Sequence, residues 1–151
     1  MLKYKSQKGF TIVELLIVIV VIGILAALVL NTFSGVQARA RDTQRQTDIN
    51  AIATQLEVYY NDNSGYPVIA DVTQAKLKGI DAGALSAPNQ TTSSITDTAT
   101  PTKDQYGYKT WQADGTTACT GASGATCPKF SLYYLKESDN PNTVQTKNSL
   151  N

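Results

Sequence analysis

The residue whose type and position most strongly suggest chemistry is Glu14. It carries the only charge in the 21 residues from Phe10 to Leu30, which are otherwise almost entirely apolar. As a helix this run would be about 31 Å long, enough to cross the hydrocarbon core of a bilayer. An ionised carboxylate at the centre of such a span costs about 2.5–3.5 kcal/mol, and less near an end. Glu14 is therefore predicted to mark a functional site and to need a partner.

A second pair of reactive side chains is Cys119 and Cys127, with seven residues between them in a segment rich in glycine, threonine and alanine. If this segment is exported, a disulfide is the expected state, whereas free thiols would indicate a reducing compartment. The membrane span favours the disulfide. Two cysteines without histidine make a poor metal site.

Composition argues against most enzyme classes. The chain has no histidine, which removes the commonest general base and the commonest metal ligand. Its formal charge of +1 gives no reason to expect nonspecific nucleic-acid binding. The remaining carboxylates and hydroxyls form no convergent catalytic set, so we predict neither an enzyme nor a cofactor.

Hard oxygen atoms gather near the C-terminus. They are supplied by Glu137, Asp139, Asn140 and Asn142. Their spacing matches no calcium loop, so we interpret the segment as a solvated turn and predict no metal site.

A weak candidate for ligand contact is the run Tyr108, Lys109 and Trp111. Aromatic side chains next to a basic one can stack on bases and contact phosphate. Only one basic residue is involved, so a sheet core with one solvated lysine is the favoured interpretation.

These residues must be positioned by one long helix and a small head. Helical spacing continues past the apolar run through Ile49, Ile52 and Leu56, which predicts one helix from about Phe10 to about Asn61. The predicted organisation has four parts: a basic leader (1–9), a membrane-spanning helix (10–30), an amphipathic extension (31–61) and an extracytoplasmic head (62–151).

The head holds few large apolar residues for its length, so it needs a helix to pack on. We expect a short helix at Thr73–Lys78 and an exposed connection at Thr91–Thr102. Strands are predicted at Gln105–Gln112 and Lys129–Leu135, in a small antiparallel sheet. The polar tail, Ser138–Asn151, is expected to be mostly irregular.

The N-terminal pattern resembles the class III signal of type IV pilins, of type II secretion pseudopilins and of competence pilins. The features that match are a basic leader, then Gly9, Phe10, Thr11 and Glu14, and then an unbroken apolar helix. The resemblance implies an α+β, type IV pilin-like fold, in which a long N-terminal helix packs on a small antiparallel sheet.

The same resemblance implies how the chain is processed and assembled. A prepilin peptidase would cut between Gly9 and Phe10 and methylate the new amine of Phe10. Glu14 would pair with that amine in a neighbouring subunit. The implied partners are further copies of the chain, the membrane before assembly, an inner-membrane platform and a cytoplasmic ATPase.

The function implied is that of a structural filament subunit. The protein would cross the cytoplasmic membrane once, with an extracytoplasmic head, and later enter an extracellular pilus or a periplasmic pseudopilus. A surface type IV pilus is the first hypothesis. The alternatives are a type II secretion pseudopilin, or a minor or competence pilin that binds DNA or a surface.

One departure from many members of this group concerns the middle of the helix. They carry a proline soon after the position of Gly23, where the helix can unwind in a filament. Here weak helix formers occupy that region, Asn31, Thr32, Ser34 and Gly35, without a proline. Unwinding between Gly23 and Gly35 is therefore left open by the sequence.

Overall fold

The computed structural model describes residues 9–151, apart from the side chains of residues 31 and 32. The predicted leader therefore lies outside the described residues, except for Gly9. Contacts divide the chain into two compact units, one ending at Gln37 and the other spanning Ala38–Asn151. The elements in chain order are α1 (Ile12–Asn63), β1 (Tyr66–Pro67), the 3-10 helices η1 (Ile69–Asp71) and η2 (Ala82–Leu85), β2 (Ile95–Thr96), β3 (Tyr106–Trp111), β4 (Thr126–Cys127), β5 (Lys129–Lys136) and β6 (Thr143–Asn148).

The long helix α1 begins and ends within two residues of its predicted bounds. It continues without a break through Gly23 and Gly35, so this single chain shows no unwinding there. At its C-terminal end the N–H of Ser64 donates to the carbonyl of Tyr60 at 2.7 Å, and Ser64 adopts a positive φ of 56°. A left-handed residue directly after the last turn is a common way to end a helix.

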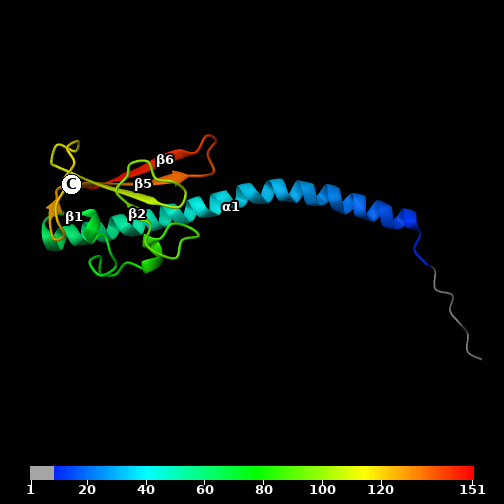
Figure 1. The fold of residues 1–151 in the computed structure, drawn as a ribbon, viewed down its shortest axis with the longest axis horizontal. Coiled ribbons are helices and arrows are strands. Elements are labelled where there is room, and N and C mark those ends of the chain that lie inside the picture. Colours follow the sequence, from blue (N-terminus) through cyan, green and yellow to red (C-terminus); the bar gives the residue numbers. More distant parts are fainter. Residues whose placement is uncertain (1–8) are drawn as a thin grey trace, which may run out of the picture. The chain divides into compact units, whose positions relative to one another are not determined.

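The head packs as two layers, with the C-terminal part of α1 lying along a sheet (Figure 1). The stripe predicted on α1 is buried in the core. Facing side chains of the sheet alternate in and out along each strand, as the pleat requires. The main contributors to the core are Ile49, Ile52 and Leu56 of α1, Tyr106 and Tyr108 of β3, and Phe130 and Leu132 of β5.

The main sheet has the strand order β2-β3-β5-β6. β3 and β5 run antiparallel, with Tyr108 opposite Leu132, and β6 runs antiparallel to β5. The α+β prediction and both predicted strands are thus confirmed. The sheet is nevertheless mixed, because the short strand β2 pairs with β3 in parallel.

The predicted irregular tail is wrong at Thr143–Asn148, which forms strand β6 at the edge of the sheet, while the rest of Ser138–Asn151 forms neither helix nor strand. Its side chains are polar and mostly exposed, so they carry no hydrophobic alternation that would indicate a strand. Backbone pairing with β5 determines its conformation instead. The expected exposed connection at Thr91–Thr102 likewise contains β2, although most of its residues are exposed.

The predicted helix at Thr73–Lys78 is also wrong, because this segment forms turns. The N–H of Leu77 donates to the carbonyl of Thr73 at 2.9 Å, so a single helical turn forms. Gly79 follows with a φ of +100°, which ends any continuation. Buried Leu77 and Ile80 hold this loop against the core instead.

Candidate functional site

The start of α1 is built by a reciprocal set of hydrogen bonds between Thr11 and Glu14. The hydroxyl of Thr11 accepts from the N–H of Glu14 at 3.2 Å, while Glu14 Oε2 accepts from the N–H of Thr11 at 2.8 Å and from its hydroxyl at 2.7 Å. This is a capping box, in which two backbone donors of the first turn are satisfied. The spacing T-x-x-E carries that signal in the sequence, but the sequence analysis did not use it.

The capping box provides part of the partner that Glu14 was predicted to need. Within a single chain its carboxylate is held by Thr11, at the end of the apolar run rather than at its centre. Both residues are exposed, so their polar groups are accessible to another molecule. The arrangement can therefore hold a carboxylate in a fixed position for a cation supplied from outside the chain.

All residues from Gly9 to Leu30 are exposed in this chain. The helix includes an 18-residue window of mean hydropathy 3.2, none of it buried within the protein, and is long enough to cross a membrane. Large exposed apolar surfaces indicate contact with lipid or with other proteins. The first unit therefore has an apolar surface that the protein itself does not cover.

The predicted cleavage point, Gly9 and Phe10, is equally accessible. Phe10 is 92% exposed, and a Cβ added to Gly9 would meet no atom within 4 Å. Among residues 9–151, no contact requires glycine at this position.

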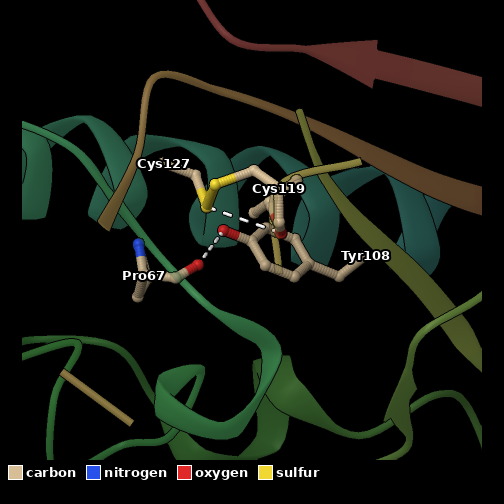
Figure 2. Close-up of a disulfide and its surroundings, with 5 residues drawn as sticks. Pro67, Tyr108, Cys119 and Cys127 are labelled. Atoms are coloured by element: carbon tan, nitrogen blue, oxygen red, sulfur yellow. Dashed lines mark hydrogen bonds between the residues drawn. A yellow bond between two sulfur atoms is a disulfide. The ribbon is translucent and has the colours of Figure 1, made fainter. Parts of the chain in front are cut away.

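Cys119 and Cys127 are joined by a disulfide in the head (Figure 2). The loop between them is also fixed by Asp71, whose carboxylate accepts hydrogen bonds from the hydroxyl of Ser123 and the N–H of Gly124. These bonds hold the pKa of Asp71 below its usual value. The disulfide and Asp71 together fasten a loop that has few apolar anchors.

The structure separates the three candidate ligand contacts. Tyr108 is 1% exposed, and its hydroxyl donates to the carbonyl of Pro67 at 2.6 Å (Figure 2). Lys109 points to the other side of β3 and pairs with Asp97 at 2.8 Å. Trp111 donates through Nε1 to Ser131 at 3.0 Å. Since each side chain has a partner within the chain and Tyr108 is buried, the three do not form one binding surface.

An ionic cluster that the sequence analysis missed joins α1 to the turn after β5. Arg41 donates to Glu137 Oε2 through Nε at 3.1 Å and through Nη2 at 2.7 Å. Arg45, which is 1% exposed, pairs with Asp42 at 2.9 Å and also with Glu137. The spacing of the arginines on α1 was the signal of this cluster in the sequence, but their partner Glu137 lies more than 90 residues away.

The electrostatics of this cluster favour ionised carboxylates. Burial by itself would raise the pKa of Glu137, but hydrogen bonds from Arg41 and Arg45 outweigh it and hold that pKa below the usual value. Burial also opposes ionisation of Asp42, whose pKa is nevertheless lowered by the amides of Glu137 and Ser138. Both charges are thus compensated inside the head.

The oxygens considered for calcium are mostly engaged elsewhere. Glu137 accepts from two arginines, and Asp139 pairs with Lys136 at 2.8 Å and accepts from the hydroxyl of Thr143. Within residues 9–151, no cluster of three or more acidic, histidine or cysteine side chains is arranged to hold a metal ion.

Comparison with known proteins gives matches over part of the chain. Residues 4–30 match the prokaryotic N-terminal methylation motif. The chain is 41% identical over 74 residues to the type II secretion system core protein G of Dickeya chrysanthemi, which covers 49% of this chain and 48% of that protein. It is 39% identical to the protein of the same name from Pseudomonas aeruginosa, over 49% of this chain and 52% of that one.

A third relative, the core protein G of Vibrio cholerae, is 40% identical over 44% of this chain and 46% of its own length. The chain thus spans about half the length of the curated relatives it matches. No solved structure matches. The chain is thus similar, over part of its length, to proteins with the prokaryotic N-terminal methylation motif and to type II secretion system core proteins G, and its long helix packs on a small sheet.

Proposed function

We propose that this chain is a structural subunit of a pilin-like filament, cleaved between Gly9 and Phe10 and held in the membrane by α1 until it assembles. The observation that carries the proposal is the capping box of Glu14 at the start of α1, where every residue from Gly9 to Leu30 is exposed. Within the first unit as the structure describes it, the carboxylate of Glu14 has no charge partner, and the apolar surface is not covered. Neighbouring copies would supply both the partner and the cover.

The proposed mechanism is assembly rather than catalysis. Cleavage creates a cationic amine on Phe10, four residues before Glu14, and methylation keeps that charge. A subunit leaving the bilayer exchanges lipid for the helices of its neighbours, and the amine of one copy neutralises Glu14 of the next. Burying a carboxylate is far less costly when it is paired.

Among filament systems, the relatives favour a type II secretion pseudopilus, because each one reported above is named a type II secretion system core protein G. A surface pilus is the competing assignment. In either case we propose as partners a prepilin peptidase, a membrane platform and an assembly ATPase. The head would be extracytoplasmic, which agrees with a disulfide there.

The experiment that tests this function is mass spectrometry of the N-terminus of the native chain, in sheared filaments and in membranes separately. We expect the chain to begin at a methylated Phe10 in whichever fraction contains it. Abundant processed chain in the sheared fibres would favour a surface pilus, and processed chain confined to the cell envelope would favour a pseudopilus. An intact N-terminus at Met1 in both fractions would contradict the proposal.

A further inference from the structure

A polar pocket of about 360 Å³ lies in the head, between the part of α1 nearest Ala38 and the end of β5. Its wall is formed from two elements that the ionic cluster joins. The side chains on α1 are Arg39, Thr43 and Gln46, and those at the end of β5 and beyond are Tyr134, Lys136 and Ser138.

The pocket offers hydrogen-bond donors more readily than acceptors. Its one carboxylate, Asp42, already accepts from the N–H groups of Glu137 and Ser138 and from Arg45. The remaining wall contributes a guanidinium, an ammonium, an amide and hydroxyls. Such a set of donors suits an oxyanion.

Arg39 is the charged group that is available for a ligand. Its side chain is exposed and, among the described residues, has no ion-pair partner. The side chain of Lys136 is 40% exposed and pairs with Asp139, which partly offsets its positive charge. A guanidinium with several neighbouring donors matches the geometry of a phosphate group.

The position of Arg39 in the chain limits where such a phosphate can come from. It follows Leu30, the end of the apolar run, by nine residues. Even fully extended, that much chain spans only about 30 Å. If α1 crosses a bilayer, the pocket therefore stays within about 30 Å of the headgroups at that end of the span, whatever the orientation of the head.

We propose that this pocket binds the phosphate of an anionic phospholipid headgroup while the subunit is in the membrane. The inference rests on the proposed membrane anchoring. It also accounts for three arginines directly beyond the span, where the distribution of charge would otherwise argue against export. Arg41 and Arg45 are neutralised by acids of the head, and Arg39 is neutralised by lipid.

The test uses the full-length protein in neutral phosphocholine micelles, with short-chain phosphatidylglycerol as the titrant. Nuclear magnetic resonance follows the backbone amides of Thr43, Gln46 and Ser138. We expect saturable shifts at these amides, and about fivefold weaker binding for Arg39→Gln, as for one basic residue lost near an anionic surface. The matched control is Lys78→Gln, an exposed lysine on the Thr73–Lys78 turn, and it should bind as the unaltered chain does.

Several results would overturn the inference. One is equal shifts with neutral short-chain lipid, and another is equal binding by the Arg39→Gln variant. Inorganic phosphate that binds as tightly as the lipid would contradict the headgroup assignment. Failure of the chain to enter micelles or bilayers would be seen separately, and it would contradict the proposed function itself.

Discussion

Glu14 and Glu137 are two carboxylates in contrasting regions of one chain. Glu137 is paired with Arg41 and Arg45, so the head neutralises its charge internally. Among the described residues, Glu14 receives the neutral donors of Thr11, at the start of an apolar run that is exposed from Phe10 to Leu30. The head therefore pairs its buried carboxylate internally, whereas the first unit leaves a carboxylate without a charge partner and an exposed apolar surface among the described residues. If the chain assembles as proposed, this difference separates the residues needed for folding from those needed for assembly.

The largest expected effect is that of Glu14→Val on assembly. It should leave membrane insertion, cleavage and the stability of the head unchanged, while incorporation into filaments falls to background because the neighbouring amine loses its counter-ion. Quantitative blotting of sheared and membrane fractions measures this. The matched variant Thr11→Val removes the capping hydroxyl but keeps the charge, so it should still assemble. Normal filaments made only of Glu14→Val would refute the pairing.

The reverse result is expected for Glu137→Gln. Removing the charge of Glu137 leaves Asp42 as the one carboxylate that compensates Arg41 and buried Arg45, so the head should lose about 3 kcal/mol of its free energy of unfolding. Denaturant titration of the full chain in detergent measures the loss. Asp139→Asn is the control, since its exposed pair with Lys136 should contribute less than about 1 kcal/mol. Equal effects of the two variants would sink this assignment.

A slightly smaller loss is expected when the disulfide is removed. The double variant Cys119→Ser, Cys127→Ser should destabilise the head by about 2–3 kcal/mol, because a short loop is released in the unfolded chain. Asp71 still fastens the loop in the folded state, so the fold should persist. The same titration measures this loss. Finding two free thiols in the native exported protein would remove the basis of the prediction.

Acidification should destabilise the head. The pKa values of Glu137 and Asp42 lie below their usual values of 4.5 and 3.8 in the folded head. Their contribution to stability is therefore complete above those values and lost as the pH falls through the lower, folded values. Thermal unfolding between pH 7 and pH 2 should show this loss, and Glu137→Gln should flatten the profile. An unchanged pH profile in that variant would contradict the role of Glu137.

The smallest effect is expected at the aromatic and basic run on β3. Lys109→Ala combined with Trp111→Ala should leave DNA binding by the full chain unchanged, since Tyr108 is buried and Lys109 is paired with Asp97. Fluorescence anisotropy with a labelled oligonucleotide measures this. A clear loss of binding in the double variant would reinstate a nucleic-acid surface.

The sequence predicted those parts of the molecule that depend on local pattern. The apolar run, the stripe through Ile49 and Leu56, and the strands rich in aromatic residues all carry a periodicity that determines their structure. Strand β6 has no such pattern. It is an edge strand, and its backbone pairing with β5 determines its conformation. The turns at Thr73–Lys78 are determined by the burial of Leu77 and by Gly79, neither of which local helix signals reveal.

The candidate site divides in the same way. Glu14 is conspicuous because it is a single charge in an apolar run, and its capping box with Thr11 is a local spacing that sequence can reveal. The cluster of Arg41, Arg45 and Glu137 joins residues far apart in the chain, so only the fold brings it together. Tyr108 could not be excluded as a ligand contact before its orientation on β3 was known.

The most direct test of the account is a structure of the assembled filament that resolves the start of α1. The account predicts that the carboxylate of Glu14 lies within about 4 Å of the Phe10 amine of a neighbouring copy, as an ion pair requires. A filament in which Glu14 contacts only Thr11 of its own chain, with every neighbouring amine farther away, would contradict it.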